Sequence, residues 1–126
     1  MGPAPTREAG RVFEPFPRQT LVGDSSATMS YLSDIYEVTP WKTLTYWFQV
    51  YASLPNTHGP PVTAYLETSD ALEGPWRELV AGGIDGSAPQ VTVGAVSGPS
   101  RYFQVRMDIQ ALETTAVAFR VVARPK

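Results

Sequence analysis

The side chains that could carry chemistry are few in this sequence of 126 residues. The chain has no cysteine and one histidine, His58, which stands in a proline-rich stretch. A catalytic histidine needs an orienting carboxylate and usually a nucleophile, while a zinc site needs several His, Cys or carboxylate ligands. Neither set of partners lies near His58 in the sequence. We therefore interpret His58 as a loop residue, and we predict no metal and no cofactor.

Carboxylates offer a second chemistry, because glycosidases work with a pair of them. Glu37, Glu67 and Asp108 fall within predicted strands, but each also fits the outward position of an alternating strand. Asp70 and Asp85 stand in segments with a faint likeness to calcium loops. The alternate spacing of acids that such loops need is absent, and turn chemistry explains both. The sequence therefore predicts that the protein is not an enzyme.

Aromatic residues are dense between positions 31 and 51. In segment 43–51 the alternation places Leu44 and Phe48 on one face and Trp47 and Tyr51 on the other. The second face could be a smaller core covered by the N-terminal segment, a platform for sugars, or a subunit interface. All three readings predict that something covers it. The residues predicted to bind a partner on this outer face are Trp41, Trp47 and Tyr51.

Short alternating segments separated by Gly/Pro turns set the fold class. The predicted strands cover residues 19–23, 28–38, 43–51, 62–69, 76–80, 90–95, 101–109 and 115–123. No segment shows a helical period of useful length. This pattern predicts an all-β protein, an antiparallel β-sandwich of jelly-roll type with about eight strands, over residues 19–126.

Residues 1–18 are predicted to form an extended, proline-rich N-terminal arm. Two phenylalanines in this segment favour an arm that packs on a surface, either on its own domain or on a neighbouring subunit. The residues of the arm predicted to bind a partner are Arg7, Arg11, Val12, Phe13, Phe16 and Arg18.

Charge and hydropathy exclude other classes of partner. The 10 Lys and Arg residues face 12 Asp and Glu residues and form no dense basic cluster, so nucleic acid is not expected. No apolar run approaches the roughly 18 residues that span a bilayer, so we expect no membrane partner. The first residues lack the layout of a signal peptide.

Residues 62–106 resemble a known family. The segment 62–70 leads to Gly74-Pro75-Trp76 and then to a strand that opens with Arg101-Tyr102. This cadence resembles discoidin-like, galactose-binding-like sandwiches, and also small β-sandwich proteins encoded among phage structural genes. The chain lacks the disulfide and the secretion signal that are common in lectin-like members. A stand-alone sandwich behind a proline-rich arm looks more like the decoration (cement) proteins of phage capsids.

The resemblance implies a non-enzymatic structural protein of the virion, made in the host cytoplasm and located on the capsid surface. Its expected partners are the major capsid protein or other shell subunits and copies of itself, as a homo-oligomer clustered in threes. The arm and the aromatic outer face would make these contacts. The alternative is a carbohydrate-binding β-sandwich module that stacks sugars on Trp41 or Trp47. A third interpretation is a sandwich of a phage tail or baseplate.

Overall fold

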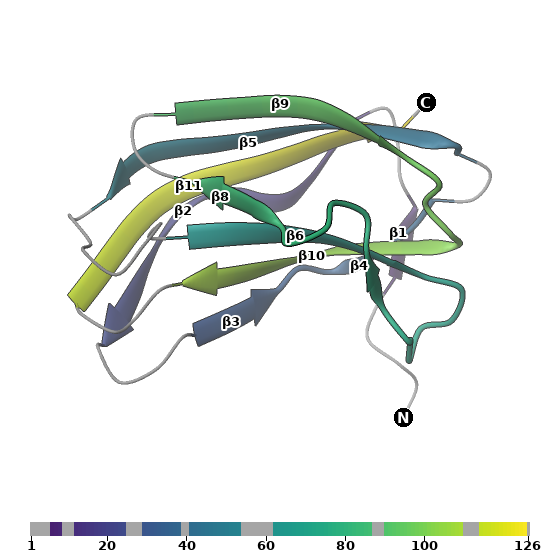
Figure 1. Ribbon diagram of the computed structural model, residues 1–126, viewed down its shortest axis with the longest axis horizontal. Helices are drawn as coiled ribbons and strands as arrows, with labels where there is room; N and C mark the ends of the chain where they lie inside the picture. Colours follow the sequence, from purple (N-terminus) through teal and green to yellow (C-terminus); the bar gives the residue numbers. More distant parts are fainter. Residues whose placement is uncertain are drawn as a thin grey trace.

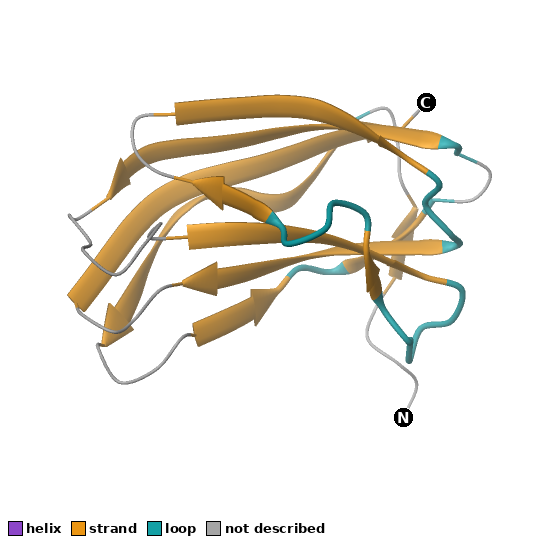
Figure 2. Ribbon diagram, viewed as in Figure 1, coloured by secondary structure: helices purple, strands orange, loops and turns teal. Residues whose placement is uncertain are grey.

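The structure is a computed structural model that describes residues 6–8, 12–24, 29–38, 41–53, 62–86, 90–109 and 114–125. These residues form strands joined by turns and loops (Figure 2). No helix long and apolar enough to cross a membrane occurs among them. The strands are β1 (Thr6–Glu8), β2 (Phe13–Asp24), β3 (Met29–Leu32), β4 (Ile35–Glu37), β5 (Thr43–Ser53), β6 (Val62–Ser69), β7 (Arg77–Glu78), β8 (Ile84–Gly86), β9 (Gln90–Ser97), β10 (Tyr102–Ile109) and β11 (Thr114–Pro125).

The strands form two sheets that pack face to face (Figure 1). The seven-stranded sheet has the order β1-β4-β10-β6-β7, with β3 also paired to β10 and β8 to β6. The four-stranded sheet has the order β2-β11-β5-β9. From β2 onward the chain passes from one sheet to the other at each step, through β3 and β4, β5, β6, β9, β10 and β11; the exception is β6, which pairs with the two strands that follow it, β7 and β8. The predicted all-β sandwich of jelly-roll type is confirmed.

Two strands of the jelly roll are interrupted. β3 and β4 both pair with β10, and Ser33 bridges the break between them. The Ser33 N–H donates to the Val105 carbonyl at 2.9 Å, and the Val105 N–H donates to Ser33 Oγ at 2.9 Å. β7 and β8 likewise both pair with β6. With each interrupted strand taken as one and β1 set aside, the described strands reduce to the eight of a jelly roll, as the sequence predicts.

β1 and β8 fall outside the predicted ranges. Each is three residues long, which is too short to show an alternating pattern. β1 also departs from the predicted antiparallel architecture, because it pairs with β4 in parallel.

The expected boundary between arm and sandwich at residue 18 falls inside β2, which begins at Phe13. β2 pairs with β11 along its length and forms an edge of the four-stranded sheet. Pro15 and Pro17 are tolerated there because an edge strand needs hydrogen bonds on one side only. The register shifts between Phe119 and Val121 and again before Ala123, opposite this proline-rich part of β2. The prolines therefore mark an edge strand, and the arm can include at most the residues before it.

Phe13 and Phe16 lie in the core, with 8% and 6% of their surfaces exposed. The Phe13 ring lies 4.4 Å from the Tyr36 ring between centroids, and the Phe16 ring meets Phe119 edge-on at 5.7 Å. The prediction that these two phenylalanines anchor a partner is corrected: their aromatic surface is already used within their own domain.

The core has the composition that the alternation predicts. Inward-facing residues of β5, β6, β10 and β11 are almost completely buried, whereas their neighbours along each strand are more exposed. The largest fully buried side chains are Phe48, Phe103 and Phe119. A buried aromatic side chain contributes more to a core than any aliphatic one because of its area. Both sheets supply these rings to a shared core, in which aliphatic side chains surround them.

The placement of Phe16 gives a first prediction. Phe16→Ala should lower the free energy of unfolding by about 3–5 kcal/mol, because it leaves a cavity beside Phe119. Val12→Ala, next to the same strand but 56% exposed, should change it by less than about 0.5 kcal/mol. Urea unfolding followed by circular dichroism measures both. Equal stability of the two variants would show that Phe16 is not a core residue.

Candidate functional site

The candidate site is the solvent side of the four-stranded sheet, here called the outer face. Its middle is formed by the side chains of β5 that alternate with the core residues, Thr45, Trp47, Gln49 and Tyr51. Register fixes their neighbours, because directly opposed residues share a face. Trp47 lies opposite Val122 of β11 and Val93 of β9.

A groove of about 270 Å³ runs over this face. It is lined by Val12, which directly precedes β2, and by Trp47 and Gln49 of β5, Val91 of β9, and Arg120 and Val122 of β11. Val12 and Val91 are 56% and 54% exposed, so their methyl groups stand in water in the isolated chain. The groove is therefore mainly apolar, with one amide and one guanidinium at its wall.

Charged groups border the groove. Arg120 Nε donates to Glu14 Oε2 at 2.6 Å, which ties β11 to β2. This hydrogen bond is the main cause that raises the pKa of the Arg120 guanidinium; desolvation lowers it, and the charge of Glu14 and the side chain of Tyr51 raise it. The Arg18 guanidinium lies 4.1 Å over the centre of the Tyr51 ring. Arg120 therefore remains cationic at any ordinary pH, and Tyr51 is partly covered by a cation of its own chain.

The structure brings together some of the predicted partner-binding residues. Trp47 and Tyr51 share the outer face as predicted, with Val12 in the groove and Arg18 over Tyr51. Trp41 is 38% exposed but lies between β4 and β5 and does not line the groove. The side chain of Arg7 lies outside the described side chains, and Arg11 and His58 lie outside the described residues.

Sequence reasoning predicted Val12 but missed Val91 and Val122, the other two valines that line the groove, and Val93 beside Trp47. Val91 and Val93 alternate with the inward residues of β9, and Val122 alternates with those of β11. The period of two places them on the side away from the core, which is a detectable signal. What the period does not give is the register that gathers β9, β11 and Trp47 at one place.

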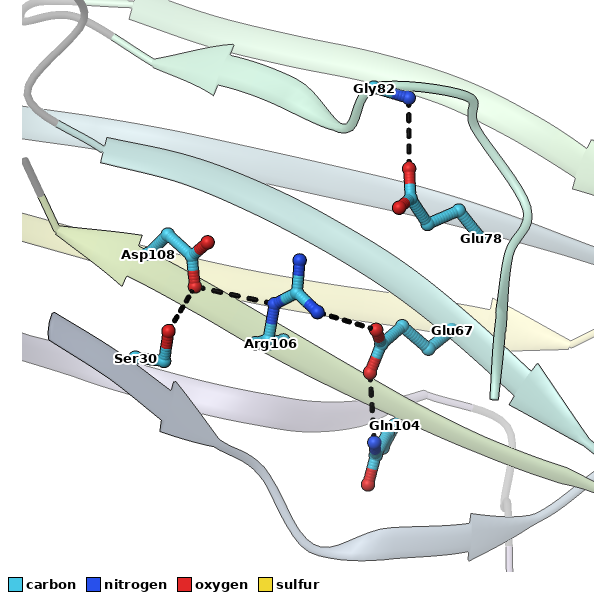
Figure 3. A network of polar contacts seen from close by, with 7 residues as sticks. All are labelled: Ser30, Glu67, Glu78, Gly82, Gln104, Arg106 and Asp108. Atoms are coloured by element: carbon cyan, nitrogen blue, oxygen red, sulfur yellow. Dashed lines mark hydrogen bonds and ion pairs between the residues drawn. The ribbon is translucent and has the colours of Figure 1, made fainter. Parts of the chain in front are cut away.

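The carboxylates considered for catalysis lie on the opposite side of the molecule, on the solvent side of the seven-stranded sheet (Figure 3). Glu67 and Asp108 both contact Arg106, at 3.1 Å from Nη1 and 3.3 Å from Nε respectively. The second contact is an ion pair whose angle does not fit a hydrogen bond. Gln104 Nε2 donates to Glu67 Oε1 at 2.9 Å, and Ser30 Oγ donates to Asp108 Oδ1 at 2.6 Å.

The charged groups of this network are paired with one another, although among the described residues the Arg106 Nε–H has no hydrogen-bond partner. The Arg106 guanidinium is paired with both carboxylates and offsets their negative charge. It also lies 4.1 Å from the centre of the Tyr65 ring. Both carboxylates use an oxygen on Arg106, so neither is left as an uncommitted base or nucleophile. Glu37 is a separate case, 3.9 Å from Arg101 at the surface. Among the described residues no group of three or more His, Cys, Asp and Glu side chains could hold a metal ion.

Trp76, the tryptophan of the family-like cadence, lies in the segment that leads into β7. It helps to line a second hollow with Asp70, Arg77 and Ser100. Gly74 has a φ of +90°, and a Cβ there would lie 2.9 Å from Trp76 Cδ1, so only glycine fits beneath the indole. Arg77 Nη2 donates to the Gly98 carbonyl at 2.7 Å. These contacts give Trp76 and its neighbours a scaffold role at this end of the sandwich.

Comparisons with known proteins identify no family for the chain. No protein-family model and no curated protein sequence matches it. Similar solved structures include the Yersinia pseudotuberculosis-derived mitogen, with 11% identity and a TM-score of 0.47 over 89% of this chain and 86% of that one. Another is the K1 cleaved adhesin domain of Lys-gingipain from Porphyromonas gingivalis W83, with 9% identity and a TM-score of 0.44 over 93% and 99%. A third is the CBM36-1 domain of a multidomain xylanase from the hindgut metagenome of Trinervitermes trinervoides, with 11% identity and a TM-score of 0.42 over 89% and 94%. At these values the likenesses carry no argument about function.

The carboxylate network gives a second prediction. Arg106→Met should lower the free energy of unfolding by about 2–4 kcal/mol, because it leaves the buried Glu67 carboxylate without its cation. The matched control is Arg101→Met, whose ion pair with Glu37 is exposed and should contribute at most about 1 kcal/mol. Chemical unfolding at neutral pH measures both, and an Arg106 variant as stable as the Arg101 variant would contradict a structural role for the network.

Proposed function

We propose that the protein is a non-enzymatic binding module of a larger protein assembly and that the groove on its outer face receives a protein partner. The observation that supports this most directly is the apolar groove beside Trp47, with Val12 and Val91 more than half exposed in the isolated chain. Exposed apolar surface gathered in one place marks an interaction site. Catalysis has no support from the carboxylates, because Glu67 and Asp108 are committed to Arg106.

The composition of the groove favours a protein over other partners. Protein interfaces are enriched in aromatic residues and arginine, and their energetic centres are enriched in Trp, Tyr and Arg. The outer face carries Trp47, Tyr51, Arg18 and Arg120 around aliphatic groups. The Glu14–Arg120 pair at the border is exposed on both sides, so it suits a polar rim that orients a partner.

In its most specific form the proposal is a decoration protein of a phage capsid. The major capsid protein or another shell subunit would then occupy the groove, and the protein would reside on the capsid surface. This form rests on the resemblance of a small β-sandwich with a proline-rich N-terminal segment to such proteins, which is an argument from analogy. A sandwich of a phage tail or baseplate follows the same logic of assembly at another place in the virion.

A carbohydrate is the second candidate for the same groove. Trp47 stands beside Gln49 and Arg120, so one aromatic surface and two polar side chains converge there. Aromatic rings and hydrogen-bond donors together suit the apolar and hydroxyl-bearing faces of a sugar. The exposed valines of the groove weigh against it, because they offer a sugar hydroxyl no partner.

The third prediction tests the groove with purified full-length chain. The chain should co-sediment with empty shells assembled from the major capsid protein of the same genome, and Trp47→Ala should weaken this binding at least about tenfold, as loss of an interface centre does. Leu32→Ala is the matched control: Leu32 is 62% exposed but lies on β3 of the other sheet, so binding should be unchanged. Titration with soluble xylan and galactan, followed by tryptophan fluorescence, forms the second arm.

Three results would contradict the proposal. The capsid role would be contradicted if the same genome encodes no capsid protein, or if the chain does not co-sediment with the shells. If Trp47→Ala and Leu32→Ala weaken binding equally, the groove is not the binding site. A saturable fluorescence change with a polysaccharide that disappears in Trp47→Phe would assign the groove to a carbohydrate.

A further inference from the structure

β9 is an edge strand without the features that usually protect a sheet edge. It pairs with β5 in unbroken register from Gln90 to Ser97, so it has no bulge. Its sequence, QVTVGAVS, contains no proline and no charged residue. Natural edge strands are commonly blunted by charges, prolines, bulges or shortness, because their free N–H and C=O groups otherwise pair with another strand.

The other edges of the sandwich show the contrast. β2, at the far side of the same sheet, carries Pro15, Pro17 and Arg18 and lies opposite two register shifts. The peripheral strands of the seven-stranded sheet, β1, β3, β7 and β8, contain two to four residues each. Among the strands that the structure describes, β9 is thus the one long edge that is both uncharged and regular.

The side chains of β9 fit a partner strand as well as its backbone does. Val91 and Val93 are 54% and 55% exposed, and Ala95 next to them is exposed as well. Gly94 needs no such partner to explain it, because it faces the core and a Cβ there would lie 2.5 Å from the Tyr46 hydroxyl. The exposed aliphatic row on the outer side therefore remains without a role inside the isolated domain.

We infer that β9 pairs antiparallel with β9 of a second copy of this chain, so that two four-stranded sheets join into one. A strand that pairs with itself in this way brings identical or nearby side chains together, and like charges there are destabilising. β9 avoids that cost because none of its eight residues is charged. A strand that carries charged residues, as β2 does, would bring like charges together if it paired with itself in this way.

The geometry also selects a register. Directly opposed residues point to the same face of a sheet. The two-fold axis must therefore lie midway between one residue of the strand and the same residue of the second copy. An axis at Val93 opposes Val93 to itself and Val91 to Ala95, which makes every contact on the outer face apolar. An axis at Gly94 would oppose Val91 to Ser97. An axis at Thr92 would oppose Val91 to Val93 but would pair only residues 90–94 of the strand, whereas an axis at Val93 pairs residues 90–96. The pairing is therefore centred on Val93.

This inference deepens the proposed role in a larger assembly and rests on it for the choice of a second copy, but it uses the backbone edge of β9, which shares Val91 with the groove. It also makes the association two-fold, whereas the family resemblance implies clusters of three. A chain that binds shells and stays monomeric would contradict the β9 pairing alone. A dimer that binds no shell would contradict the capsid role alone.

The fourth prediction concerns the mass of the full chain in solution. Light scattering across a concentration series should show the mass rising from 13.8 kDa to twice that value. Val93→Lys should weaken dimerisation at least about tenfold, because two ammonium groups would meet at the axis. Val22→Lys is the matched control, since Val22 is 58% exposed on the other edge strand of the same sheet, and it should leave the dimer unchanged.

Single cysteines test the register in a chain that has none of its own. Val91→Cys, Val93→Cys and Ala95→Cys are each oxidised under mild conditions, and the fraction of disulfide-linked dimer is measured by non-reducing gel electrophoresis. Antiparallel pairing about Val93 brings only that position next to its own copy, so cross-linking should be highest there. A 1:1 mixture of the Val91 and Ala95 variants should cross-link more than either variant alone.

Four results would overturn the inference. These are a monomer at every concentration, a trimer, a dimer that Val93→Lys and Val22→Lys affect equally, and equal cross-linking at all three positions. The last would indicate a parallel or non-specific contact. Circular dichroism spectra and thermal midpoints close to those of the unmodified chain establish that each variant is folded.

Discussion

The position of β11 between β2 and β5 is the constraint on which the four-stranded sheet depends. The last strand of the chain pairs with the first long strand on one side and with β5 on the other (Figure 1). It supplies Phe119 to the core and Arg120 and Val122 to the outer face. Without β11, β2 would have no partner strand in this sheet, and the groove would lack Arg120 and Val122. Such long-range pairing delays folding, because distant segments must meet before any contact stabilises them.

The fold follows from the sequence to a large extent because a sandwich imposes a period of two on every long strand. Segments such as 43–51 and 101–109 show this period clearly, and their inward residues are buried as expected. The prediction was wrong where one sequence feature, a pair of closely spaced prolines, is compatible with two different structures. Pro15 and Pro17 were interpreted as part of an extended arm outside the sandwich, but proline also fits an edge strand, and Phe13 and Phe16 belong to the core.

The candidate site was predictable only in part for a different physical reason. Alternation alone separates Trp47 and Tyr51 from the core. The groove also needs Val12, Val91 and Val122, which are remote in sequence and meet only through the registers of three strand pairs. The carboxylates show the same limit. The period of two places Arg106 next to Asp108 on β10, but only the register between β6 and β10 brings Glu67 to the same guanidinium.

The prolines of β2 have a consequence for the size of an assembly built from this sheet. If two copies join through β9, the two strands left at the outside of the extended sheet are both β2. A proline has no N–H to offer a further strand, and Arg18 adds a charge at the same edge. Contacts of the same patch with itself close after one step, whereas a second open edge would allow a fibre. The proline-containing start of β2 would thus end the growth of the sheet, and the assembly would stay finite.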